Sequence, residues 1–322
     1  MTIMELRPLR NSSLRASAVG LGCNNFGRTG TATQSQEGTT AVINAALDAG
    51  ITFFDTADVY GGTWGLSESL MAEALRSRRD QAIVATKFGH VMVATPLDEH
   101  GPKGARAYIR AAVDASLGRL GIDAIDLYQQ HTPDPSVPIG ETLSALGELV
   151  GEGKIRAYGH SQFTAEQILQ AERAALELGV PPFVTSQDEL SLARRAVETD
   201  GRFAAAADAG LGFLPFFPLA NGLFTGKFTR TDRPAGTRIT EIRPQIADDA
   251  DWDAMEAYQR LCDERGITML EATFGWFLAN PVVASVIAGA TRPEQVVQNA
   301  AAASAWAPSA EDIAAIDALF PA

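Results

Sequence analysis

Cysteine is scarce in this sequence: there are two among 322 residues, Cys23 and Cys262. They lie far apart and neither belongs to a CxxC pair, which excludes a disulfide framework and a cysteine-based zinc or redox motif. This usage is typical of a reducing compartment, so we expect a cytoplasmic protein. The four histidines also lack metal-ligand spacing, and we expect no metal site.

Long hydrophobic runs are missing too. The more apolar stretches, such as 82–85 and 213–220, are much shorter than the roughly 18 residues that a membrane-spanning helix needs. Residues 1–14 contain two arginines among polar residues and lack the apolar core of a signal peptide. We therefore expect a soluble protein with no membrane partner.

Basic residues are in deficit, with 26 Lys and Arg against 39 Asp and Glu, for a net charge of -13. A chain with this balance repels a polyanion and does not release counterions from it. Nucleic acid is therefore excluded as a bulk partner.

Short aliphatic or β-branched runs alternate with longer segments whose apolar residues recur three and four apart, which indicates strands alternating with helices. The predicted strands are residues 18–21, 52–55, 82–86, 125–129, 155–159, 183–186, 212–216 and 283–287. The predicted helices are residues 39–49, 67–76, 105–119, 139–150, 165–178, 203–209 and 269–279. Thr164 and Gln167 have the spacing of a capping box for the helix that follows the fifth strand.

Eight strands with intervening helices predict a (β/α)8 TIM barrel, in which residues 1–322 form a single domain. A doubly wound sheet split into two domains is the alternative. No strand is followed by GxGxxG, however, and no Pro/Gly/Ser-rich linker divides the chain.

Two segments interrupt the alternation, 89–104 after the third strand and 220–250 after the seventh, and we predict that both are loops. In a barrel they lie on the C-terminal face, where active sites are built. The tail, 300–322, contains a predicted helix at 310–319 that we expect to close over the mouth.

Ionisable residues stand at the ends of several predicted strands, and strand ends converge on one mouth of a barrel. Asp55 ends the second strand, Lys87 follows the third, His131 follows the fourth, and Tyr60 lies in the loop after Asp55. A lone aspartate or lysine at such a place is more often a helix cap or a solvated loop residue, but together the four residues make a recognisable constellation.

This constellation, with its surroundings, resembles the aldo-keto reductase superfamily over nearly the whole chain. The motifs that carry the resemblance are FDTADVYG (54–61), ATKFG (85–89), DLYQQH (126–131), GKIRAYGHS (153–161), PLANGLFTGK (218–227) and GAT (289–291), followed by Gln295 and Asn299. The resemblance implies a barrel that uses NADPH without a Rossmann domain and that reduces aldehydes or ketones to alcohols.

The resemblance also implies catalytic roles. Tyr60 is the expected general acid, and Lys87 lowers the pKa of its phenol. Asp55 accepts a hydrogen bond from Lys87 and keeps it charged, while His131 orients the substrate carbonyl.

For the cofactor, the resemblance assigns the backbone of the segment 218–221 and Lys227 to the pyrophosphate. An acidic protein needs a local group of cations to bind phosphates, and Arg238 and Arg292 are further candidates for it. It assigns Ser161, Gln162 and Gln187 to the nicotinamide carboxamide and Phe216 to the ring. The complete predicted set is Gly22, Cys23, Asn24, Asp55, Ser161, Gln162, Gln187, Phe216, Phe217, Pro218, Leu219, Ala220, Asn221, Lys227, Arg238, Gly289, Thr291, Gln295, Gln298 and Asn299. The chain departs from many relatives at three positions, where they have asparagine, tyrosine and serine and it has Gln162, Leu190 and Phe217.

The substrate is less defined. Phe26, Trp64 and Phe88 are candidates to line an apolar entrance and equally to be core residues, and His90 is a candidate substrate contact. We expect a small carbonyl compound as substrate, and an oligomer is possible. Two other functions stay open: an NADPH-sensing regulatory subunit without significant turnover, and a Schiff-base lyase that uses Lys87 as nucleophile.

Overall fold

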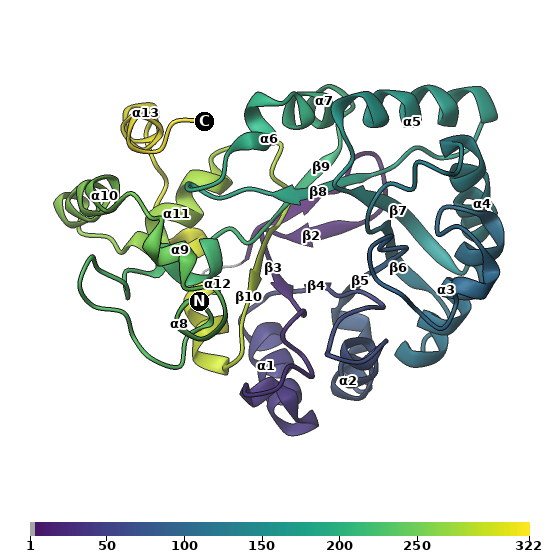
Figure 1. The fold of residues 1–322 in the computed structure, drawn as a ribbon, viewed down its shortest axis with the longest axis horizontal. Helices are drawn as coiled ribbons and strands as arrows, with labels where there is room; N and C mark the ends of the chain where they lie inside the picture. Colours follow the sequence, from purple (N-terminus) through teal and green to yellow (C-terminus); the bar gives the residue numbers. More distant parts are fainter. Residues whose placement is uncertain (1–3) are drawn as a thin grey trace.

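The computed structural model describes residues 4–322, in which eight parallel strands close into one barrel (Figure 1). In chain order these strands are β3 (Val19–Gly22), β4 (Phe53–Asp55), β5 (Ile83–Phe88), β6 (Ile125–Gln130), β7 (Ile155–Ser161), β8 (Thr185–Glu189), β9 (Gly212–Phe216) and β10 (Val286–Gly289). Strand β10 pairs with both β3 and β9, which closes the ring. The predicted (β/α)8 barrel is confirmed, and each predicted strand overlaps an observed one.

A ring of helices covers the outside of the barrel (Figure 1). These helices are α1 (Gln36–Asp48), α2 (Leu66–Leu75), α3 (Arg106–Leu120), α4 (Ile139–Gly151), α5 (Ala165–Leu178), α7 (Arg202–Asp208), α11 (Met269–Leu278) and α12 (Pro293–Ala305). Thr164 and Gln167 form the predicted reciprocal capping box at the start of α5. Helix α12 was not predicted from the sequence, although Pro293 in its first turn is a helix-start signal.

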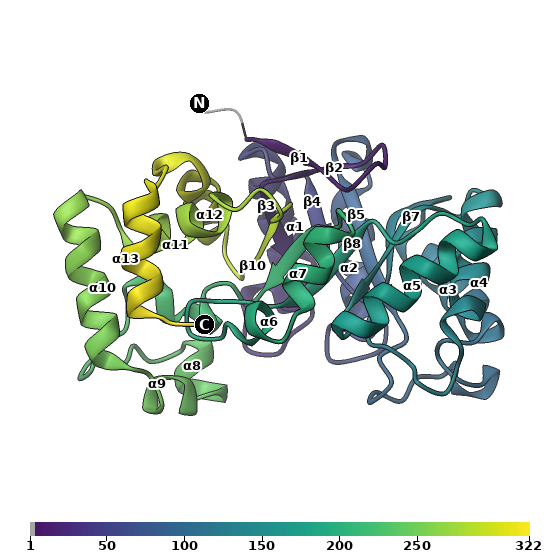
Figure 2. The same ribbon diagram turned by 90° about the horizontal axis from the view of Figure 1, so that it is seen from above.

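An antiparallel hairpin, β1 (Leu6–Pro8) and β2 (Arg15–Ser17), precedes the barrel and was not predicted. Leu9, Leu14 and Ala16 are buried there and pack with apolar side chains from the barrel interior. Figure 2 shows the hairpin at one end of the barrel and the loops that carry α8 and α9 at the other. The hairpin therefore closes the amino-terminal end and leaves the carboxyl ends of the strands for a site.

Two arginines fix this hairpin to the barrel wall. Arg7 donates hydrogen bonds to the carbonyl oxygens of Leu278 (2.7 Å) and Val283 (2.8 Å). Arg10 forms a two-pronged contact with the carboxylate of Glu172, at 2.7 and 2.8 Å. Paired hydrogen bonds of this kind fix orientation as well as distance.

The segment after β9 differs from the prediction of a plain loop over 220–250. It contains a 3-10 helix, η4 (Ala220–Thr225), and two short helices, α8 (Arg238–Ile242) and α9 (Gln245–Asp248), before α10 (Trp252–Arg265). The Thr237 side chain caps α8 in a local capping box, a signal that apolar periodicity does not reveal in so short a helix. The other short 3-10 helices are η1 (Ala32–Gln34), η2 (Arg79–Gln81) and η3 (Asp98–His100), the last within the predicted 89–104 loop.

The tail helix α13 (Ala310–Leu319) forms at the predicted residues, but its predicted position over the mouth is corrected. It packs beside α10 (Figure 2), and Asp317 accepts hydrogen bonds from Arg195, next to α6 (Ala196–Thr199), and from Trp276. None of its residues lines the described cavity at the carboxyl ends of the strands. Within residues 4–322 no helix has the length and apolarity to cross a membrane.

Candidate active site

Strand periodicity builds the site in layers, because every second side chain of a barrel strand points inward. Apolar inward residues form a lower layer inside the barrel: Phe53, Ala85, Leu127 and Leu214. Two residues further along the same strands stand Asp55, Lys87, Gln129 and Phe216. The register therefore places a polar layer directly above an apolar one, at the carboxyl ends of the strands.

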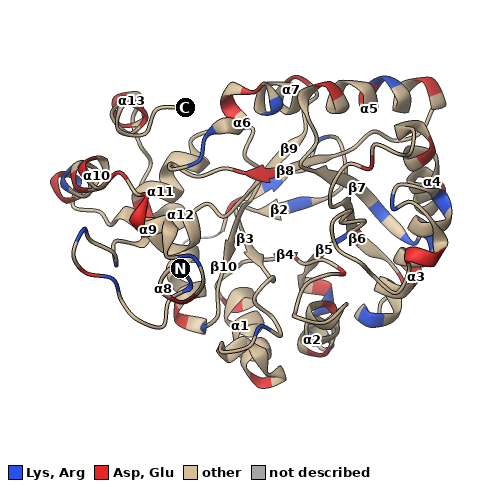
Figure 3. Ribbon diagram, viewed as in Figure 1, with Lys and Arg blue, Asp and Glu red and all other residues tan. Residues whose placement is uncertain are grey.

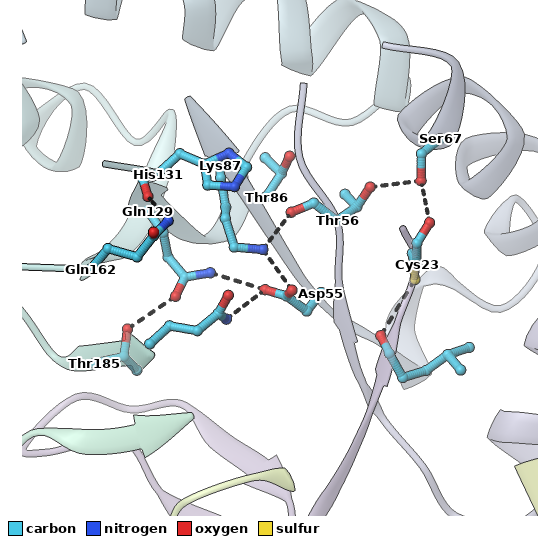
Figure 4. Close-up of polar contacts among 12 residues, drawn as sticks. Cys23, Asp55, Thr56, Ser67, Thr86, Lys87, Gln129, His131, Gln162 and Thr185 are labelled. Atoms are coloured by element: carbon cyan, nitrogen blue, oxygen red, sulfur yellow. Dashed lines mark hydrogen bonds and ion pairs between the residues drawn. The ribbon is translucent and has the colours of Figure 1, made fainter. Parts of the chain in front are cut away.

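The Asp55 carboxylate is the centre of this polar layer (Figure 4). Oδ2 accepts a hydrogen bond from Lys87 Nζ at 2.6 Å, and Oδ1 accepts from Gln129 Nε2 (3.1 Å) and Gln187 Nε2 (2.9 Å). Lys87 Nζ also donates to the carbonyl oxygen of Thr56 at 3.0 Å. Four strands thus hold one buried ion pair in a fixed geometry.

Gln129, which the sequence analysis did not single out, is itself held by Thr185, whose Oγ1 donates to Gln129 Oε1 at 3.4 Å. The neighbouring position on β7 is Gly159, and a Cβ there would lie 1.9 Å from Thr185 Oγ1. Glycine is therefore required at this position for Thr185 to reach Gln129. The alternation of side chains along the strand could have identified Gln129, because Gln129 lies two residues after Leu127 and so points into the barrel as well.

Burial keeps Tyr60 a protonated phenol beside the Lys87 ammonium. Lys87 Nζ lies 5.2 Å from the centre of the Tyr60 ring. Burial raises the pKa of Tyr60, while the Lys87 ammonium lowers it. Burial alone lowers the pKa of Lys87, but Asp55 and Tyr60 outweigh burial and raise it, so Lys87 stays charged.

Two histidines complete this group. The His131 ring lies edge-on to Tyr60 at 5.6 Å and to His90 at 4.7 Å, measured between ring centres. Burial, together with the charge of Lys87, holds the pKa of His131 well below its usual value, so the ring is neutral at physiological pH. His131 Nδ1 and His90 Nδ1 are buried without a hydrogen-bond partner among the described residues.

A cavity of about 1000 Å³ opens above the polar layer, at the upper end of the range for small-molecule sites. Asp55, Tyr60, His90 and His131 line it, while Lys87 lies behind Asp55 and Tyr60. The predicted cofactor residues that line it are Gly22, Asn24, Asp55, Ser161, Gln162, Gln187, Phe216, Phe217, Pro218, Leu219, Asn221, Lys227, Arg238, Gly289, Thr291, Gln295, Gln298 and Asn299. Residues from all eight strand ends thus meet around one cavity.

Backbone strain gathers in the same place. In the described chain, five residues other than glycine have a positive φ, and four of them are Gln162, Phe217, Ala220 and Asn221. Such conformations cost of order 1–3 kcal/mol each and cluster at ligand sites. The two segments that carry them are those predicted to bind the cofactor.

Two predicted cofactor residues do not belong to the lining of the cavity. The Cys23 side chain is fully buried outside the cavity, its backbone N–H donates to the Asp55 carbonyl at 2.8 Å, and its carbonyl accepts from Ser67 Oγ at 2.9 Å. Ala220 is buried within η4 and does not line the cavity. Cys23 and Ala220 are therefore neighbours of cavity-lining residues but do not line the cavity themselves.

Three aromatic residues also lie away from the cavity. Because Lys87 points into the barrel, Phe88 must point outward, where it stacks on Tyr128 at 4.7 Å. Phe26 is fully buried in the same outer core. The Trp64 ring lies 4.0 Å from the Arg119 guanidinium carbon, outside the cavity lining. Of the four candidate substrate contacts, His90 alone lines the cavity.

Basic side chains crowd this cavity although the chain is acidic overall. Five cations line it: Arg28, Lys227, Arg238, Arg243 and Arg292. None of the five pairs with a carboxylate among residues 4–322. Arg28 and Arg243 were not singled out from the sequence, because a lone arginine in a loop has no pattern.

Comparison with known proteins agrees with this geometry. Residues 18–320 match the aldo/keto reductase family. The chain belongs to that family. It is 32% identical to the L-glyceraldehyde 3-phosphate reductase of Escherichia coli K12, over 98% of this chain and 92% of that protein. It is 34% identical to an uncharacterised oxidoreductase of Bacillus subtilis (91% and 89%) and 31% identical to a probable voltage-gated potassium channel subunit beta of Arabidopsis thaliana (92% and 90%).

As an aldo/keto reductase, the protein is an oxidoreductase of carbonyl compounds. The surroundings of Lys87 disfavour the Schiff-base alternative, since a lysine nucleophile needs a neutral amine and this one is charged, hydrogen-bonded and fully buried. The described residues contain no group of three His, Cys, Asp or Glu side chains that would hold a metal ion.

Proposed function

We propose that this aldo/keto reductase reduces an aldehyde or ketone to an alcohol with NADPH, and that Tyr60 is the general acid. The observation that carries the proposal is the buried Asp55–Lys87 pair beside a neutral Tyr60, below a cavity lined by unpaired cations. This arrangement supplies both a proton donor and the charge that stabilises its conjugate base.

The cavity fits a phosphorylated dinucleotide. Lys227, Arg238 and Arg292 are the candidate phosphate ligands, and all three are unpaired among the described residues. The amide nitrogen of Gln187 is used by Asp55 and that of Gln162 by the His131 carbonyl (3.2 Å), which leaves their amide oxygens to accept hydrogen bonds from a carboxamide. Phe216, at the end of β9, offers an aromatic face to the nicotinamide.

The bound cofactor supplies the hydride. As negative charge develops on the carbonyl oxygen, Tyr60 gives its proton to that oxygen, and the Lys87 ammonium stabilises the phenolate that remains. Asp55 keeps Lys87 charged and in place. Neutral His131 directs a ring nitrogen at the same oxygen and fixes the angle of the carbonyl.

The first prediction tests Tyr60. We expect Tyr60→Phe to lower kcat by roughly 10²- to 10⁴-fold, because it removes the proton donor. Binding of NADPH, followed by quenching of its fluorescence, is expected to be unchanged. Turnover is measured as NADPH oxidation with a panel of aldehydes and ketones.

Tyr128→Phe is the matched control, since Tyr128 is buried, its hydroxyl has no partner among the described residues, and it faces away from the cavity. Unchanged turnover in Tyr60→Phe would overturn the proposed role. Tight NADPH binding by the wild-type protein, with negligible turnover of every carbonyl and co-purification of a membrane partner, would favour the sensing function instead.

A further inference from the structure

Arg28 is a cation of the cavity that the proposed function leaves without a role. It lies in the loop between β3 and α1, and its guanidinium donates one hydrogen bond, to Asn25 Oδ1 at 2.9 Å. It has no acidic partner among the described residues. Because arginine stays protonated in proteins, this half-buried charge lacks a counterion.

The Arg28 loop is in direct contact with the loop that carries Tyr60. Gly27, with φ of +79°, packs against Gly61, with φ of +107°: a Cβ on Gly27 would lie 2.8 Å from the Gly61 carbonyl oxygen. A Cβ on Gly61 would lie 3.0 Å from the Phe26 carbonyl oxygen. Both glycines are therefore needed for this close approach, and Arg28 and Tyr60 are each one residue from it.

The other cations are arranged differently. Arg238 and Arg243 flank the Phe217 ring, with guanidinium carbons 5.2 and 5.5 Å from its centre, on the segment after β9. The candidate phosphate ligands of the cofactor all follow β9 or β10. Arg28 instead lines the cavity from the loop after β3, next to the loop that carries Tyr60, and its charge also acts on Arg238.

The acids of the cavity do not neutralise Arg28. Asp55 is paired with Lys87, and Glu189 lies 3.5 Å from Arg194. Glu241 accepts a hydrogen bond from the backbone N–H of Gly236 at 3.1 Å. Arg28 therefore has no partner among the acids that line the cavity in the described chain.

We propose that Arg28 binds an anionic group of the carbonyl substrate, so that the preferred substrates are short aldehydes or ketones that carry a carboxylate or a phosphate. This inference rests on the proposed function and names the substrate class for it. A charge-assisted hydrogen bond from a guanidinium to such a group fixes the substrate at one end, while Tyr60 and His131 hold the carbonyl at the other.

The test compares kcat/KM for matched pairs of aldehydes: succinic semialdehyde against butanal for a carboxylate, and glycolaldehyde phosphate against glycolaldehyde for a phosphate. In wild-type protein we expect the anionic member of at least one pair to be preferred. In Arg28→Gln we expect that preference to fall about ten- to hundredfold, the effect of one hydrogen bond to a charged group. We expect Arg28→Lys to restore part of it, and the rise in the Kd for NADPH in Arg28→Gln to be smaller than the loss of substrate preference.

Arg260→Gln is the matched control, because Arg260 is exposed on α10, is unpaired in the described part of the chain and lies outside the cavity. An equal kcat/KM for both members of each pair, or a preference that survives Arg28→Gln, would overturn the inference alone. A raised Kd for NADPH with equal losses for all four substrates would assign Arg28 to the cofactor and overturn it too. No NADPH oxidation by the wild-type protein with any carbonyl would overturn the proposed function itself.

Discussion

Asp58 lies two residues before Tyr60 and is completely buried, and neither carboxylate oxygen has a hydrogen-bond partner among the described residues. Burial, reinforced by the charge of Glu68, raises the pKa of Asp58 to about 7, although Arg119 and Lys103 act in the opposite direction. The unfolded chain titrates near the ordinary value of about 3.9. The folded protein therefore holds a proton that the unfolded chain has lost between about pH 4 and pH 7, and its stability falls as pH rises through this window.

We predict that Asp58→Asn stabilises the fold at pH 8, by up to roughly 4 kcal/mol, because the cost of a buried charge disappears. At pH 4 the wild-type carboxyl is already neutral, so the gain is expected to vanish. Denaturant unfolding at the two pH values measures it. Asp208→Asn is the control, because it makes the same change at an exposed position that has no ion-pair partner within residues 4–322. A gain that is equal at both pH values would contradict the prediction.

Individual residues were predictable where a motif and a strand end coincide. Asp55, Tyr60, Lys87 and His131 were named from the sequence, and the structure brings their side chains together. Asp58 and Arg28 were not predicted to matter, because burial without a partner and the lack of a counterion are properties of three-dimensional surroundings. For Phe88 the sequence alone held enough information. Side chains alternate along β5, so if Lys87 points into the barrel, Phe88 points into the outer core.

At the scale of elements, the unpredicted β1–β2 hairpin has the clearest structural role, since it closes one end of the barrel. Each of its strands has three residues, too few for an alternating pattern to be recognised. Most barrel strands and their helices were predictable because they are longer and more strongly patterned, while β4, which also has three residues, lies at the end of the apolar run 51–54. The ends of the barrel strands were harder to predict. Strands β8 and β10 both extend beyond the predicted range, to Glu189 and Gly289, because polar residues or glycine replace the apolar run there.

We predict that Leu9→Ala destabilises the protein by about 2–5 kcal/mol, the usual cost of emptying a buried leucine site. The active site lies at the other end of the barrel, so kcat/KM of the folded enzyme is expected to stay within about twofold of wild type. Thermal or denaturant unfolding, together with kinetics at low temperature, measures the two effects. Leu6→Ala in the same hairpin is the control, because Leu6 is 44% exposed and its loss is expected to cost little.

At the scale of the whole molecule, the charge distribution is uneven. The chain carries a net charge of -13, and acidic and basic residues are interspersed over the outer helices (Figure 3). The five cations of the cavity are the exception, since they share one site without acidic partners among residues 4–322. An anionic cofactor therefore meets repulsion from the molecule as a whole and attraction from the cavity.

The dependence of the Kd for NADPH on salt shows whether repulsion by the whole molecule or attraction by the cavity controls binding. Added salt screens distant charges beyond about 10 Å at 0.1 M, but it also competes for the cations that contact the ligand. We predict that the Kd for NADPH rises severalfold between about 20 mM and about 500 mM NaCl, and rises less for NADH, which has one phosphate fewer. Fluorescence titration at several salt concentrations measures both. A Kd for NADPH that falls as salt is added would show that the overall negative charge dominates.

The closed amino-terminal end has a consequence for the polar layer at the other end of the barrel. Leu9, Leu14 and Ala16 pack with the apolar side chains of the barrel interior, on which the layer around Asp55 rests. The buried ion pair therefore has apolar packing on one side and the cavity on the other. In the proposed reaction, the cofactor and the substrate both reach Tyr60 from the cavity side, so the charge of Lys87 acts on them with little screening by water from below.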